Sequence, residues 1–147
     1  MRVAVASGKG GTGKTTVATN LAWIAAQEDR SVVYLDCDVE EPNGQIFLKP
    51  IVDWRRPVTV AVPEVDPVVC DLCGQCGEIC QFSAIVCAGK KVLVFPELCH
   101  SCGGCDLVCP LSAITEVPRN IATVMAGHAG SLRYYKGLLN IGEAMSP

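Results

Sequence analysis

Residues 8–15 read Gly-Lys-Gly-Gly-Thr-Gly-Lys-Thr, which fits the pattern G-x4-G-K-[ST]. On average residue usage, only about a few chains per thousand of this length would contain the pattern by chance. The flanking residues supply the elements that such a loop needs. Residues 2–7 form a short apolar run that predicts a buried strand, and the residues after the loop place Val17, Leu21 and Ile24 on one face of a predicted helix. Strand, glycine loop and helix therefore come in the order that a phosphate-binding loop requires.

The chemistry of this loop predicts a site for ATP and Mg²⁺. Glycines let backbone N–H groups close around phosphates, and the start of the following helix adds the positive end of its dipole. We expect Lys14 to contact the β- and γ-phosphates and the Thr15 hydroxyl to bind Mg²⁺. The loop residues do not by themselves distinguish ATP from GTP. The predicted nucleotide-binding residues are Gly8, Lys9, Gly10, Gly11, Thr12, Gly13, Lys14, Thr15 and Thr16.

Eight of the ten cysteines fall into two runs that share the spacing C-x2-C-x2-C-x3-C. A cubane iron–sulfur cluster needs four thiolates, and in this spacing the first three cysteines bind one cluster while the fourth binds the other. The spacing therefore predicts two [4Fe-4S] clusters with crossed ligand sets. One cluster is expected to take Cys70, Cys73, Cys76 and Cys109, and the other Cys99, Cys102, Cys105 and Cys80.

An internal repeat supports the two-cluster interpretation. The same tripeptide, Ser-Ala-Ile, follows each run at residues 83–85 and 112–114, an offset of 29 positions, which predicts two-fold pseudosymmetry. Zinc knuckles and disulfides are the alternatives for a cysteine-rich chain, but zinc does not explain a third cysteine at x2 and a fourth at x3, twice. The two cysteines outside the runs, Cys37 and Cys87, are expected to pack as small apolar residues.

This stretch resembles bacterial-type two-cluster ferredoxins over roughly residues 65–117. One departure is Gln81, which stands where that family usually has proline after the fourth cysteine. Between the two halves, the apolar segments on either side of Gly89-Lys90 predict a β-hairpin. Because a unit of about fifty residues has little core of its own, the clusters would stabilise it.

The glycine loop carries a second lysine, Lys9, that the general motif does not require. Here the chain resembles the MinD/Mrp group of P-loop ATPases, whose signature is this lysine. The resemblance implies a dimer in which Lys9 reaches the partner's nucleotide, and it implies that Asp38 orients the attacking water. Lys9, Lys14 and Asp38 are thus the predicted catalytic residues, and Asp36 either contacts Mg²⁺ through water or caps a strand.

The whole chain resembles MinD superfamily P-loop ATPases that contain an inserted ferredoxin domain. The expected fold is α/β, with an incomplete parallel sheet bearing a deviant Walker A loop and an inserted α+β bacterial-type ferredoxin domain. We expect residues 1–62 to form the first part of the ATPase domain, 63–118 the ferredoxin insertion, and 119–147 the return segment. The second switch motif of the family is not in the sequence, so we expect the chain to correspond to the N-terminal half of a family member.

Composition excludes some classes of protein. The net charge of −3 and pI near 5.3 argue against a nucleic-acid partner, because no basic stripe is present to neutralise phosphates. No apolar run reaches the length of a membrane span. Reduced cysteines and the lack of a signal-peptide pattern lead us to expect a cytoplasmic protein.

Three functions fit these observations. The leading one is an ATP-binding protein that couples nucleotide binding and hydrolysis to electron transfer through two [4Fe-4S] clusters, with a redox protein as partner and a homodimer or related heterodimer as the working form. A second is an ATP-dependent scaffold or carrier that delivers clusters to an acceptor protein. A third is a ferredoxin-type electron carrier whose truncated nucleotide site no longer hydrolyses ATP.

Overall fold

The computed structural model describes residues 1–28 and 30–143 of the chain. These residues belong to two compact units, the first made of residues 1–28, 30–58 and 122–143 and the second of Thr59–Ile121. Two long strands, β2 (Ile51–Val65) and β5 (Ile114–Ala129), contribute residues to both units. The second unit contains both cysteine runs, and the first contains the glycine loop.

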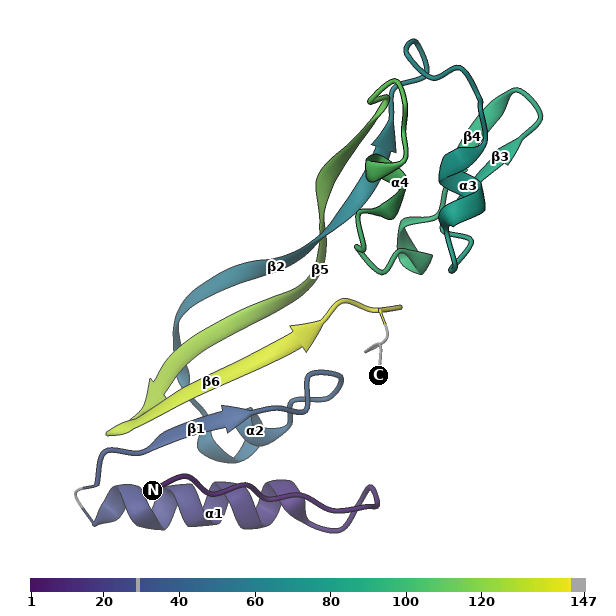
Figure 1. The fold of residues 1–147 in the computed structure, drawn as a ribbon. Coiled ribbons are helices and arrows are strands. Elements are labelled where there is room, and N and C mark those ends of the chain that lie inside the picture. The colour runs from purple at the N-terminus through teal and green to yellow at the C-terminus, as the bar shows by residue number, and fades with distance from the viewer. Residues whose placement is uncertain (29, 144–147) are drawn as a thin grey trace. The chain divides into compact units, whose positions relative to one another are not determined.

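The first unit is built on a mixed sheet (Figure 1). Its other elements are α1 (Lys14–Gln27), β1 (Val33–Asp36), α2 (Gly44–Leu48) and β6 (Leu132–Leu139). The strand order is β1-β6-β5-β2, with β1 parallel to β6 and β5 antiparallel to β6. The parallel pairing expected from the sequence is present between β1 and β6, but the sheet also contains the antiparallel pair of β5 and β6. The reason is the tight turn at Gly130, which has φ 61° and connects β5 directly to β6, since strands joined by a short turn must run antiparallel.

Helix α1 packs against the sheet through small side chains, and the apolar residues that the sequence placed on one face of the helix lie largely outside this contact. Thr19, Ala22 and Ala26 are buried, whereas Val17, Leu21 and Ile24 are 57%, 48% and 58% exposed. Ala22 and Ala26 pack in one core cluster with Leu48, Leu132 and two tyrosines, Tyr34 and Tyr134, whose rings stack at 5.6 Å. We attribute the choice of face to these rings, because small side chains let the helix approach bulky aromatic groups closely.

Residues 2–7 do not form the strand that the apolar run predicted. They have no regular secondary structure, and Val3 is 57% exposed. Figure 1 shows this segment leading into the glycine loop without joining the sheet. A buried strand needs backbone partners and covered faces, and within the described residues no strand pairs with this segment.

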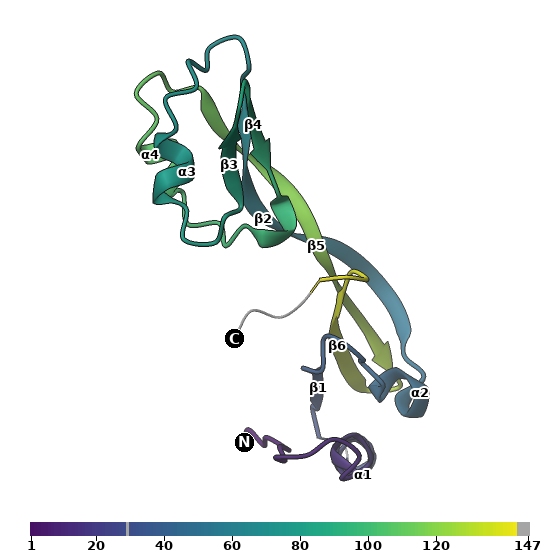
Figure 2. The same cartoon turned by 90° about the vertical axis from the view of Figure 1, so that its right-hand side faces the viewer.

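The second unit holds two short helices beside a hairpin (Figure 2). Its own elements are α3 (Gln75–Ile79), β3 (Ile85–Ala88), β4 (Lys91–Val94), the 3-10 turn η1 (Pro96–Leu98) and α4 (Gly104–Leu107). The antiparallel pairing of β3 with β4, from Ile85 opposite Val94 to Ala88 opposite Lys91, confirms the predicted hairpin. Its turn includes Gly89 at φ 60°, a conformation that favours glycine.

The predicted two-fold pseudosymmetry is present in the backbone of the second unit. Positions with positive φ recur 29 residues apart, as the pairs Leu72 and Ser101, Gly74 and Gly103, and Ser83 and Ser112. The hydrogen bonds between the halves are reciprocal. The Asp66 amide donates to the Ala113 carbonyl at 2.8 Å, and the Phe95 amide, 29 positions later, donates to the Ala84 carbonyl, 29 positions earlier, at 2.7 Å. Each half therefore contacts the other through equivalent atoms.

Candidate functional site

The glycine loop of the first unit curls on itself before α1 begins. Gly11 and Gly13 have φ of 70° and 87°, so side chains at these positions would strain the backbone. The Lys9 carbonyl accepts hydrogen bonds from the Ser7 hydroxyl at 2.8 Å, the Thr12 hydroxyl at 3.3 Å and the Lys14 ammonium at 3.4 Å. These bonds fold the Lys14 side chain back across the loop.

The start of α1 provides the donors that a phosphate group needs. The helix begins at Lys14, with Gly13 as its N-cap in the left-handed conformation and no side chain capping it. The first N–H groups of a helix have no partner within the helix, so they are available to an anion. An added Cβ at Gly8, Gly10, Gly11 or Gly13 would meet nothing within 4 Å, so the space beside the loop backbone is open. The predicted nucleotide residues thus form one loop and the first turn of one helix.

The two aspartates after the first strand have different environments. Asp36 is buried at the end of β1, where its Oδ2 accepts hydrogen bonds from the Gly44 amide at 2.8 Å and the Tyr134 hydroxyl at 3.3 Å. Asp38 is exposed on the following loop, and its Oδ1 accepts from the Glu41 amide at 3.3 Å. Asp36 therefore anchors α2 to the sheet, and Asp38 remains the carboxylate that a ligand could approach.

A buried lysine completes the polar network around Asp36. Lys136 lies opposite Asp36 in the register of β1 and β6, and its ammonium donates to the Gln45 side-chain oxygen at 2.6 Å. Burial lowers the pKa of Lys136, although the Asp36 charge opposes this. Burial raises the pKa of Tyr34 to about 12, and Asp36 adds to the rise. These shifts arise because polar groups of the sheet are packed against apolar ones.

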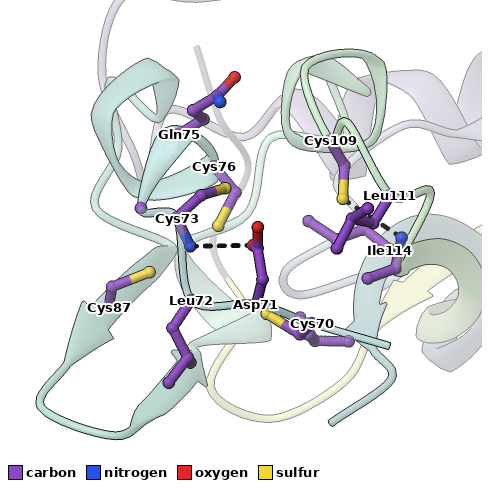
Figure 3. Close-up of a pocket in the computed structure, with 13 residues that line it drawn as sticks. Cys70, Asp71, Leu72, Cys73, Gln75, Cys76, Cys87, Cys109, Leu111 and Ile114 are labelled. Carbon is purple, nitrogen blue, oxygen red and sulfur yellow. Dashed lines mark hydrogen bonds between the residues drawn. The ribbon is translucent and has the colours of Figure 1, made fainter. Parts of the chain in front are cut away.

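In the second unit, each predicted ligand set lies around one cavity. The first cavity lies beside α3 and is lined by Cys70, Cys73, Cys76 and Cys109 (Figure 3). Three of these residues come from the first half of the repeat, and Cys109 reaches the cavity from the second half. The space of this cavity is about 350 Å³ including its opening to solvent.

The second cavity repeats this arrangement with the halves exchanged. Cys99, Cys102 and Cys105 line it from the second half and Cys80 from the first, in a space of about 470 Å³ including its opening. The ring of His100 stacks on Phe82 at 3.7 Å between centroids, and both residues line this cavity. Among the described residues, no group of three or more His, Cys, Asp or Glu side chains is placed to hold a single metal ion. The predicted cysteine ligands line two cavities.

Backbone amides point at several of these sulfurs. The Ala84 amide donates to Cys80 Sγ at 3.3 Å, and the Ala113 amide, 29 positions later, donates to Cys109 Sγ at 3.2 Å. Burial by itself raises the pKa of the Cys80 thiol, but backbone N–H groups from Phe82 to Ile85 donate to it and bring the pKa below its ordinary value. Such donors favour the thiolate, which is the form that binds metal.

Sequence reasoning misplaced the two remaining cysteines. Cys37 and Cys87 are exposed and do not pack as apolar residues. Cys87 lies on β3 and lines the first cavity together with Cys76. Burial raises the pKa of Cys76 to about 11, and the neighbouring Cys87 adds to the rise. The signal that could have pointed to Cys87 is the 29-residue repeat, which pairs Cys87 with Glu116 and so places a potential metal ligand at the same position of both halves. In the structure, Glu116 lines the second cavity.

No helix in the described part of the chain is long and apolar enough to cross a membrane.

Several curated proteins are similar to parts of this chain. An uncharacterized protein of Methanocaldococcus jannaschii is 38% identical over 87 residues, which are 58% of this chain and 30% of that protein. An uncharacterized ATP-binding protein of the same organism is 46% identical over 46 residues, 31% of this chain and 17% of its own length. An iron-sulfur cluster carrier protein of Pseudomonas fragi is 56% identical over 55 residues, 37% of this chain and 19% of its own length. The chain thus spans less than a third of the length of these relatives.

A family model covers almost the whole chain. The model of the CobQ/CobB/MinD/ParA nucleotide binding domain matches residues 3–142, which include the glycine loop, the β1 strand with Asp36, and the strands β5 and β6. The match confirms the resemblance that Lys9 and Lys14 indicated. The chain belongs to the CobQ/CobB/MinD/ParA family of nucleotide-binding domains.

Proposed function

We propose that this chain is an ATP-binding iron–sulfur protein in which the nucleotide state controls electron transfer through two [4Fe-4S] clusters. The observation that carries the proposal is the reciprocal placement of the eight cysteines around two cavities, in a chain of a nucleotide-binding family. The second unit would then be the inserted ferredoxin domain, and the first unit part of the ATPase domain.

The donor chemistry of the cavities fits two clusters. The two cysteine runs give each cavity four thiols, three from one half of the repeat and one from the other, which is the ligand pattern that the C-x2-C-x2-C-x3-C spacing produces in two-cluster ferredoxins. Amide donors to Cys80 and Cys109 stabilise thiolate charge, and such hydrogen bonds are one of the means by which a protein sets a cluster's potential. When bound, the clusters would supply one-electron redox chemistry. The chain's own residues would hold them, shield them and stabilise their charge.

The nucleotide loop fits ATP with Mg²⁺ in the same way. The open backbone of Gly8 to Gly13 and the start of α1 would surround the phosphates, with Lys14 on the β- and γ-phosphates and Thr15 on the metal. Asp38, exposed after β1, would orient the attacking water, and Lys9 would reach the nucleotide of a second subunit. In this proposal Asp38→Asn retains ATP binding and loses hydrolysis.

Redox titration of the anaerobically reconstituted chain, followed by EPR, tests whether nucleotide controls the clusters. We expect Mg-ATP to shift the midpoint potential or the spectrum of at least one cluster in the wild-type chain. The matched control is Lys14→Ala, which should contain the same iron and show no response to Mg-ATP. Identical titrations of the wild-type chain with and without Mg-ATP would contradict nucleotide control.

A second candidate is ATP-dependent delivery of clusters to an acceptor protein. It is favoured by the similarity to a protein named as an iron-sulfur cluster carrier, of which this chain spans 19%. The two functions differ in what leaves the chain. Incubation with an apo-ferredoxin and Mg-ATP should move iron and sulfide to the acceptor if the chain is a carrier, and should leave its iron content unchanged if the clusters only transfer electrons.

A further inference from the structure

Cys87 lies within the ligand shell of the first cavity, although it belongs to neither cysteine run. It lines the cavity together with Cys70, Cys73, Cys76 and Cys109. Figure 3 shows Cys87 on the β3 side of this space and Cys76 on α3 across from it. The first cavity therefore contains five thiols where a cluster needs four.

The close approach of α3 to β3 brings Cys87 next to Cys76. Gly77 follows Cys76 on α3, and an ideal Cβ at Gly77 would lie in van der Waals contact with the backbone nitrogen of Cys87, at 3.5 Å. Cys76 and Cys87 both line the first cavity. Cys76 is buried in the core of this unit with Ile85, whereas Cys87 is exposed.

The equivalent position of the second cavity carries a carboxylate. Cys87 and Glu116 are 29 positions apart, which is the offset of the repeat, and Glu116 lines the second cavity. Its Oε1 would lie 3.5 Å from an ideal Cβ at Gly103. The pseudosymmetry therefore places a potential fifth ligand at both cavities, but only the first is a soft thiol of the kind that iron–sulfur clusters prefer.

We propose that Cys87 is an alternative iron ligand of the first cavity and can replace Cys76 there. This inference rests on the proposed function, because it assumes that the cavity holds a cluster. In the exchange, an iron–sulfur bond to Cys87 forms as the bond to Cys76 breaks, and the proton of the Cys87 thiol passes to the released Cys76 thiolate. No electron is transferred. The first cavity can thus release Cys76 and still offer four thiolate ligands. The second cavity has only four thiols, so the loss of any one leaves three.

Ligand deletion in matched positions of the two halves tests the inference. The full chain is reconstituted anaerobically with iron and sulfide, and both are measured per chain along with the EPR spectrum. Two [4Fe-4S] clusters correspond to about eight iron atoms. We expect Cys76→Ala to retain the wild-type iron content, and Cys105→Ala, its counterpart 29 positions later, to lose about one to four iron atoms, because its cluster keeps only three thiolates. Cys76→Ala with Cys87→Ala should lose iron as Cys105→Ala does.

A gain-of-ligand variant guards against loss of folding at the buried Cys76. Glu116→Cys should restore iron to Cys105→Ala by giving the second cavity the thiol that the first already has. Equal iron loss in Cys76→Ala and Cys105→Ala, or retention that does not depend on Cys87, would overturn the inference. If Cys76→Ala loses all its iron, the Glu116→Cys result decides, and failure to restore iron overturns it. A wild-type chain that binds no iron would refute the proposed function and this inference together, whereas losses confined to the variants refute the inference alone.

Discussion

Substitution of Gly127 by alanine should destabilise the first unit by pushing two strands apart. Gly127 lies on β5, next to β2 in the sheet. An ideal Cβ at this position would overlap the Ile51 carbonyl oxygen of β2, and would lie 2.9 Å from the Ile51 carbonyl carbon and 3.0 Å from Val52 Cα. All three atoms belong to the backbone, so no side chain can rotate to make room.

The expected loss of stability follows from these contacts. Overpacking of a tight site costs about 1–3 kcal/mol, and a clash with backbone places Gly127→Ala at the upper end of that range. The change also restricts the unfolded chain, which returns about 0.4–1 kcal/mol. The net loss is therefore about 2 kcal/mol. Gly137→Ala on β6 is the matched control, because its Cβ would meet only side-chain atoms of Val39, with Cγ1 at 2.9 Å and Cβ at 3.7 Å, and that side chain can move. Its expected loss is below about 1 kcal/mol.

Urea unfolding followed by tryptophan fluorescence measures both variants. Trp23 and Trp54 are the two tryptophans of the chain, and both lie in the first unit, so their emission reports on that unit. The midpoint should fall clearly in Gly127→Ala and only slightly in Gly137→Ala, with an unchanged slope. The reasoning is refuted if Gly127→Ala stays within about 0.5 kcal/mol of the wild type, or if Gly137→Ala is the more destabilised of the two.

Three further outcomes are expected. Burial raises the pKa of Tyr34 from 10.0 to about 12 in the folded chain. Between these two pH values the unfolded chain binds fewer protons than the folded chain, so the free energy of unfolding falls as the pH rises. Tyr34→Phe should weaken this fall, which a comparison of urea midpoints at about pH 9 and pH 11 measures. Lys14→Ala should abolish Mg-ATP binding in calorimetry and leave the iron content intact. The control Lys49→Ala, at an exposed lysine outside the loop, should bind Mg-ATP normally. Equal binding by the wild type and both variants would exclude the glycine loop as the nucleotide site. Cys73→Ser should lose iron and keep its ATP affinity. Chelation of iron from the wild-type chain should reduce the far-ultraviolet circular dichroism that the second unit contributes. An unchanged spectrum after chelation would show that this unit folds without metal.

Short-range patterns in the sequence predicted the local structure of both units. The glycine loop followed by a helix depends on neighbouring residues, because left-handed glycines and the unpaired N–H groups of a helix start are local properties. The hairpin at Gly89 and the 29-residue repeat are local for the same reason. The family followed from the same loop, since Lys9 and Lys14 lie within six residues of each other.

Long-range packing decided what these patterns could not. The apolar residues Val17 and Leu21 lie on one face of α1, but the helix packs through a different face, which fits against the stacked rings of Tyr34 and Tyr134. These two tyrosines are a hundred residues apart in the chain, so the sequence pattern around the helix does not reveal this contact. The sheet is mixed because β5 and β6 meet at a tight turn, and spacing along the sequence does not reveal which strands become neighbours.

The cysteines of the candidate site show the same difference between what local spacing predicts and what long-range packing decides. Their spacing within each run is a property of the sequence and was enough to predict two crossed sets of four. The membership of Cys87 is a property of the tertiary structure, because it depends on β3 packing against α3 beside Gly77. The sequence by itself indicated which eight cysteines could serve as ligands and in which sets, and only the folded chain decided that Cys87 joins one of these sets, since that depends on contacts between segments that the chain brings together in space.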